Sequence, residues 1–129
     1  MSLTVKRITA VLVVDAVEPS LAFWQTTLGF TKLADVPHGD VLGFAMLERD
    51  GYEVMLQSVA SAKDDLPAGL ATPPGTAAAL FIEVSDLALI EHALGSYPLA
   101  MPRRKTFYGM HEIGVVEPGG HFVIFAQPE

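Results

Sequence analysis

The composition of the chain limits the classes of protein to which it can belong. With 129 residues, half of them hydrophobic, it can form one substantial hydrophobic core but not two, so we expect a single domain over residues 1–129. Cysteine is absent, which excludes disulfides, thiolate metal sites and a cysteine nucleophile, and fits a reducing, cytoplasmic location. The formal net charge of −7 disfavours nucleic acids and anionic membranes as partners and favours a neutral or cationic ligand.

The first half of the chain shows strand, helix and hairpin patterns in turn. Residues 8–14 are β-branched and apolar, which predicts a buried strand; the run is too short to span a membrane and lacks the cleavage site of a signal peptide. Residues 19–28 have helical spacing, ended by Gly29. A short strand over residues 30–36, a turn at 37–40 and a hairpin formed by residues 41–48 and 52–57 are expected to follow.

The second half shows the same order of patterns. Residues 58–76 are rich in Ala, Pro, Gly and Asp without clear periodicity, which predicts a connection between the halves. Residues 78–84 then form a second apolar segment, residues 87–94 a second helical pattern closed by Gly95, and residues 110–117 and 121–127 a second hairpin.

The two halves are therefore an internal repeat, covering about residues 8–57 and 77–127. Each predicts a β-α-β-β-β module, in which a curved sheet has a helix on one face and an open face on the other. The expected fold class is α+β, with two such modules. Two open faces brought together would enclose a cleft, the usual place for a small ligand.

Five segments carry a family resemblance. They are VLVVDAVEPSLAFW at residues 11–24, LGF at 28–30, GYEVMLQ at 51–57, TFYGM at 106–110 and EPGGH at 117–121. In this order they resemble the vicinal oxygen chelate superfamily, which contains the glyoxalases, the bleomycin-resistance proteins and the extradiol dioxygenases. The resemblance covers nearly the whole chain and is specific to the fold, whereas one fold can host many functions.

The resemblance also implies where metal-using members hold their ion. Carried over by position, the four ligand positions fall on Thr9, Met55, Ala79 and Ile124. None of these side chains is a normal ligand for a divalent cation, which prefers imidazole or carboxylate, so no metal and no other cofactor is expected. The histidines, at positions 38, 92, 111 and 121, show no ligand spacing and are expected to be mostly exposed.

Several other side chains are candidates for contacting a ligand. Glu53 and Glu83 each interrupt an apolar strand; a carboxylate there can pair with a cation or act as a base, or it can simply reach water near a strand end. The basic run at residues 103–105 can receive an anion, although a solvated charge run is the expected alternative. Aromatic and flexible apolar side chains fit the floor of a pocket, core filling or a dimer contact equally well; they are Phe44, Met46, Met55, Phe81, Tyr108 and Phe122. Trp24 is expected in the core.

The sequence thus leads to a first hypothesis of a metal-free homodimer of the bleomycin-resistance kind. It would bind or sequester a small aromatic or cationic molecule in an acidic, apolar cleft. The predicted ligand-binding set is Thr9, Phe44, Met46, Glu53, Met55, Gln57, Ala79, Phe81, Glu83, Tyr108, Phe122 and Ile124. The alternative is an enzyme of the same fold, either a metal-independent lyase or isomerase using Glu53, Glu83 or Tyr108, or a metalloenzyme with ligands elsewhere. A structural or regulatory module has no sequence feature in its favour.

Overall fold

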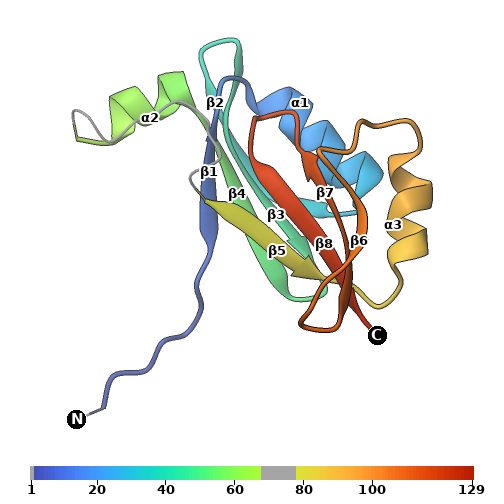
Figure 1. The fold of residues 1–129 in the computed structure, drawn as a ribbon. Helices are drawn as coiled ribbons and strands as arrows, with labels where there is room; N and C mark the ends of the chain where they lie inside the picture. The colour runs from blue at the N-terminus through green and yellow to red at the C-terminus, as the bar shows by residue number, and fades with distance from the viewer. Residues whose placement is uncertain (1, 68–77) are drawn as a thin grey trace.

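The structure is a computed structural model that describes residues 2–67 and 78–129. Its first module contains β1 (Ala10–Val14), α1 (Val17–Ala22), the π-helical segment η1 (Phe23–Thr27), β2 (Thr31–His38), β3 (Val41–Arg49) and β4 (Tyr52–Ser58). Its second module contains β5 (Ala79–Glu83), α3 (Leu87–Leu94), β6 (Met101–Lys105), β7 (Met110–Val116) and β8 (Phe122–Pro128). The β-α-β-β-β repeat and the α+β class are therefore confirmed (Figure 1).

Each module forms a four-stranded sheet with the same topology. The strand orders are β1-β4-β3-β2 and β5-β8-β7-β6. In the first sheet β1 pairs in parallel with β4, and in the second β5 pairs in parallel with β8. The other neighbours are antiparallel. Side chains alternate between the two faces of a strand, so the registers determine which residues share a face.

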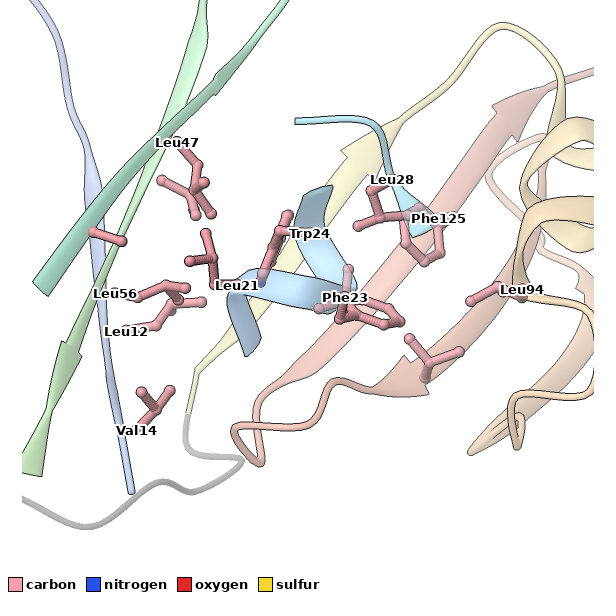
Figure 2. Close-up of a cluster of buried hydrophobic side chains, with 14 of the residues drawn as sticks. Leu12, Val14, Leu21, Phe23, Trp24, Leu28, Leu47, Leu56, Leu94 and Phe125 are labelled. Carbon is pink, nitrogen blue, oxygen red and sulfur yellow. The ribbon is translucent and has the colours of Figure 1, made fainter. Parts of the chain in front are cut away.

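One hydrophobic core joins the two sheets through the first helix. Leu21, Phe23 and Trp24 lie on α1 and η1, between Leu56 of the first sheet and Phe125 of the second (Figure 2). All five side chains belong to one buried cluster, and Trp24 has the core position that its spacing predicted. The face of each sheet that looks toward this helix is therefore the core face, and the opposite face looks outward.

The residue ranges of two elements were not predicted from the sequence. Helix α2 (Val59–Asp65) lies within the segment predicted to be an irregular connection; the rest of that prediction, residues 68–76, falls outside the described residues. Strand β6 follows the second helix, where the β-α-β-β-β repeat implies a strand, but no residue range was predicted for it. The first helix also widens before it ends, because Leu28 N–H donates to Phe23 O, five residues back, at 3.3 Å.

The helices in the described ranges are short. None of them is long and apolar enough to cross a membrane.

Candidate functional site

The outward face of the first sheet carries every predicted ligand-binding residue of the first module except Thr9. Met55 pairs with Val11 on one side and Met46 on the other, and Gln57 pairs with Val13 and Phe44. Glu53 points to the same side, two residues before Met55. Thr9 is half-buried and directly precedes β1. This face, called the sheet-1 face below, combines flexible apolar side chains with one carboxylate and one amide.

The outward face of the second sheet holds the second group of predicted residues. Phe81 pairs with Ile124, and Ala79 pairs with Phe122. Glu83 ends β5 on the same side and is exposed. This surface is called the sheet-2 face below.

The two faces do not meet within one chain. Both core faces contribute to the cluster around α1 and η1, so the sheet-1 and sheet-2 faces point away from each other (Figure 2). Val11 and Phe81, one on each face, are 48% and 51% exposed. The structure therefore brings together the predicted residues of each module, but it does not form a cleft between the two modules of a single chain.

A pocket of about 430 Å³ lies at one end of the sheet-1 face. Helix α2 forms one wall and strands β2, β3 and β4 form the others. Its lining residues are Val36, Pro37, His38, Phe44, Gln57, Ser61, Asp64 and Asp65. Of these, only Phe44 and Gln57 were predicted from the sequence, because the carboxylates come from the unexpected helix.

Polar contacts organise this pocket around the amide of Gln57. Gln57 is buried, and its Nε2 lies 3.3 Å from both Ser61 Oγ and Asp65 Oδ2. His38 Nε2 lies 3.2 Å from Asp64 Oδ2. Asp64 is largely exposed, so its carboxylate remains open to water at the pocket rim. The pocket thus combines an apolar floor with two carboxylates, a combination suited to a flat cation.

The predicted carboxylates on the two faces differ in their surroundings. Glu53 is mostly covered, and its Oε1 accepts a hydrogen bond from Arg7 Nη1 at 2.7 Å. The alternative interpretation, that Glu53 simply reaches water near a strand end, is therefore wrong. Glu83, by contrast, is exposed at the end of β5.

The donor set does not suit a divalent metal. Thr9, Met55, Ala79 and Ile124, the positions implied by the resemblance, offer one hydroxyl, one thioether and two hydrocarbon side chains, where three or four nitrogen or oxygen donors are needed. Glu53 is already paired with Arg7. Within residues 2–67 and 78–129, no group of three His, Cys, Asp or Glu side chains is placed to hold an ion.

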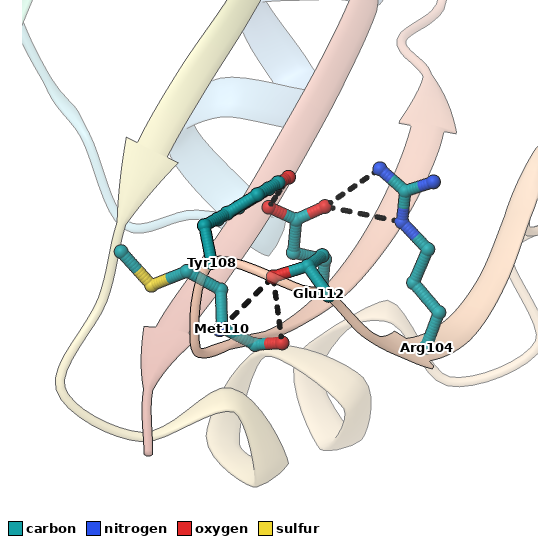
Figure 3. A network of polar contacts seen from close by, with 5 residues as sticks. Arg104, Tyr108, Met110 and Glu112 are labelled. Atoms are coloured by element: carbon teal, nitrogen blue, oxygen red, sulfur yellow. Dashed lines mark hydrogen bonds and ion pairs between the residues drawn. The ribbon is translucent and has the colours of Figure 1, made fainter.

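A buried polar network occupies the sheet-2 face near β6 (Figure 3). Glu112 is fully buried; its Oε1 accepts from Arg104 Nε and Nη2 at 3.2 and 2.9 Å, and its Oε2 accepts from the Tyr108 hydroxyl at 2.6 Å. The hydrogen bond to Glu112 raises the pKa of Tyr108 and also that of Arg104. The interpretation of residues 103–105 as a solvated charge run is therefore wrong for Arg104. Sequence reasoning missed Glu112, because its burial depends on a strand whose residue range was not predicted.

The surroundings of one histidine also differ from the expectation. His121 is mostly covered, and its Nδ1 lies 3.0 Å from Oε1 of the buried Glu117. The same carboxylate oxygen accepts from the His121 backbone N–H. This pair shapes the turn between β7 and β8, and it lies away from the outward faces. His92 is exposed, as expected, whereas His38 and His111 are only partly exposed.

Comparisons with known proteins place the chain among solved structures of the same fold. A glyoxalase/bleomycin resistance protein/dioxygenase from Nocardioides is 21% identical over 98% of this chain and 86% of its own, with a TM-score of 0.74. TnmS3, an antibiotic binding protein from Streptomyces sp. CB03234, is 18% identical over 99% of this chain and all of its own, with a TM-score of 0.71.

The bleomycin-binding protein from bleomycin-producing Streptomyces verticillus, solved with copper(II)-bleomycin, is 22% identical over 99% of this chain and all of its own, with a TM-score of 0.64. No curated protein matches the chain. The model of one protein family matches residues 5–125, nearly the whole repeat. The chain therefore belongs to the Glyoxalase/Bleomycin resistance protein/Dioxygenase superfamily.

Proposed function

We propose that the protein binds and sequesters a small aromatic or cationic molecule, without a metal ion and without converting it to a product. The observation that carries this proposal is the pocket under α2, where Phe44 provides an aromatic floor and Asp64 and Asp65 provide negative charge. The overall charge of −7 attracts a cation from a distance. Two structural neighbours are, by their names, a bleomycin-binding and an antibiotic binding protein, which agrees with this class of function.

The geometry favours binding over catalysis. A general base must be able to accept a proton near neutral pH, but the hydrogen bond to Glu112 raises the pKa of Tyr108. Glu53 is held in an ion pair with Arg7. Glu83 is exposed and open to a substrate, but within the described parts of the chain it has no side-chain hydrogen bond or ion pair that would orient it. The lack of cysteine fits a reducing compartment, and we propose a cytoplasmic location.

The binding experiment uses thioflavin T, a flat permanent cation, and its uncharged benzothiazole analogue 2-(4-methylaminophenyl)benzothiazole. We expect wild-type protein to bind thioflavin T in fluorescence titrations, and the Asp64→Asn/Asp65→Asn variant to bind it about tenfold more weakly, because two nearby charges are lost. Affinity for the uncharged analogue should change little. Added zinc or manganese, or a chelator, should leave both affinities unchanged.

The matched control is Asp15→Asn/Asp50→Asn, which removes the same charge from exposed positions outside the pocket. It should retain wild-type affinity for thioflavin T. The proposal is wrong if the wild-type protein does not bind the cation, or if the control variant loses as much affinity as the pocket variant. Turnover of a ligand by the purified protein would support the enzyme alternative.

We also propose that two copies form a dimer that covers the outward faces. A chain of this size that exposes Val11 and Phe81 on opposite faces gains by burying them. The sheet-1 face of one copy then meets the sheet-2 face of the other, which encloses the cleft that a single chain does not form.

Light scattering at micromolar concentration should give the mass of a dimer, and Phe81→Arg should shift the protein toward the monomer because it places a charge in the contact. Leu89→Arg is the control, since Leu89 is 66% exposed on the helix α3 rather than on an outward sheet face. A monomer mass for the wild-type protein, or equal effects of the two variants, would contradict the dimer.

A further inference from the structure

The buried carboxylate of Glu112 lies on the outward side of the second sheet, not in the core. Arg104 pairs with Glu112 across β6 and β7, and Glu112 pairs with Ala126 across β7 and β8. Ala126 in turn pairs with Glu83 on β5. Directly paired residues point to the same face, so this row belongs to the sheet-2 face. The side chain of Glu112 is nevertheless 0% exposed, and its two hydrogen-bond partners are groups from that same face.

Those two partners remain open to the outside. The side chain of Arg104 is 51% exposed and Tyr108 is 49% exposed. The buried carboxylate therefore holds in place two residues that a ligand can reach. Charge-assisted hydrogen bonds of this kind are short and directional, so they reduce the freedom of a long arginine side chain.

The contact with Glu112 uses only one edge of the Arg104 guanidinium group. A guanidinium has five N–H donors, and Glu112 accepts from Nε and from Nη2. The other edge is formed by Nη1 and the second N–H of Nη2. Nη1 makes no hydrogen bond within the described parts of the chain. This edge has the fork geometry that matches the two oxygens of a carboxylate or two of the three oxygens of a sulfonate.

The surroundings of this edge favour a flat ligand with an anionic group. Tyr108 and the guanidinium group of Arg104 lie on opposite sides of the Glu112 carboxylate (Figure 3), and the ring of Tyr108 packs edge-to-face on Phe107 with ring centroids 5.0 Å apart. Phe107 is fully exposed. Glu83 stands three strands away in the same row, about 14 Å at ordinary strand spacing. That distance exceeds the screening length in physiological salt, so Glu83 repels an anion at Arg104 only weakly.

We propose that Arg104, positioned by Glu112, binds the oxyanion of a small flat molecule, a carboxylate or sulfonate, whose ring packs against Tyr108 and Phe107. Within one chain this site is separate from the cation pocket, because it lies on the other sheet and uses none of the residues around Gln57. Arg104 is the binding residue, and Glu112 is a positioning residue that acts through it.

The test compares two fluorescent probes that differ only in an anionic group. They are 8-anilinonaphthalene-1-sulfonate and its uncharged counterpart N-phenyl-1-naphthylamine. We expect Arg104→Lys to lower affinity for the sulfonate about tenfold, because a lysine ammonium has no second edge with which to bind two oxygens of an oxyanion while it pairs with Glu112. Affinity for the uncharged probe should stay within about twofold of wild type.

Arg103→Lys is the matched control. Arg103 is the neighbouring residue on β6, is similarly exposed, and also pairs with a glutamate, Glu91. It should leave both probe affinities unchanged. Circular dichroism on each variant checks that the fold is retained.

A second variant tests whether the preference for the sulfonate comes from Arg104 itself, and not from the net charge of the protein or from a loss of stability. Arg104→Met/Glu112→Gln removes one positive and one negative charge, so the net charge is unchanged and no unpaired charge stays buried. It should lose the preference for the sulfonate and keep affinity for the uncharged probe. The proposal is overturned if either Arg104 variant retains wild-type preference for the sulfonate, if both probes lose affinity equally, or if Arg103→Lys has the same effect as Arg104→Lys.

Discussion

Replacing Trp24 with alanine should lower the free energy of unfolding by about 3–5 kcal/mol, the usual cost of deleting a buried aromatic side chain. Trp24 is 0% exposed and packs edge-to-face on Phe30, with ring centroids 5.0 Å apart. It lies on the segment that joins the two sheets (Figure 2). A cavity there weakens both modules at once. Urea unfolding should be followed by far-ultraviolet circular dichroism, because the variant has no tryptophan left.

The control is Leu89→Ala on α3. Leu89 is 66% exposed, so its truncation should change the free energy of unfolding by no more than about 0.5 kcal/mol. If the two variants unfolded at the same urea concentration, Trp24 would not have the central role in the core that its position indicates. Two separate transitions in the Trp24→Ala variant would show that the modules can unfold independently.

Gly119→Ala should destabilise the protein by about 1–3 kcal/mol through overpacking. Gly119 is in the turn between β7 and β8, where a methyl group would overlap Val14 Cγ1 and would lie 2.6 Å from both Glu117 Oε1 and Ser20 Oγ. Val14 and Ser20 are fully buried, and a β-branched valine has little freedom to turn away. The turn therefore approaches β1 and α1 too closely for any side chain at position 119. Urea unfolding of the Gly119→Ala variant measures the loss in the free energy of unfolding.

A double-mutant cycle checks this explanation. In a Val14→Ala background the overlap with Cγ1 is removed, so Gly119→Ala should cost less than it does in the wild-type protein. Strictly additive effects would show that the cost of Gly119→Ala comes from the backbone of the turn instead. Full wild-type stability of Gly119→Ala would contradict the close approach itself.

The strands and helices of the repeat could be predicted because their side-chain periods are simple. Along β4, Glu53, Met55 and Gln57 alternate with Val54 and Leu56, and a two-residue period assigns them to one face without knowledge of the neighbours. The helix over residues 87–94 was predicted with its observed bounds, since Leu87 and Leu94 mark its buried side.

Helix α2 could not be predicted in the same way. Its only buried residue is Ala62, so it has no apolar stripe to reveal a helical period. One local signal was present, because the Ser58 side chain accepts from Ser61 N–H as a helix cap. Strand β6 carries Pro102 and three basic residues; charge and proline are common on exposed edge strands but do not by themselves indicate a strand.

The candidate site was therefore only partly predictable. Residues such as Met46 and Phe81 could be assigned to a face from alternation alone. The partners of Glu112 could not, because Arg104 faces it only through an irregular β6 register, with a shift between Met101 and Arg104. The side-chain period of one strand does not determine its register against a strand that is distant in the sequence, so contacts that depend on that register cannot be predicted from it.

The position of α1 between the sheets gives the protein two kinds of surface that can change separately in evolution. In β1, β4 and β5 the side chains that form or pack against the hydrophobic core are all even-numbered, whereas the odd-numbered ones face outward. A substitution at Val11, Met55 or Phe81 should therefore change the chemistry of an outward face with little cost to folding, and the two faces can change separately. A combinatorial library restricted to these outward positions should retain a high fraction of folded members, which makes the chain a convenient scaffold for selecting new small-molecule binders.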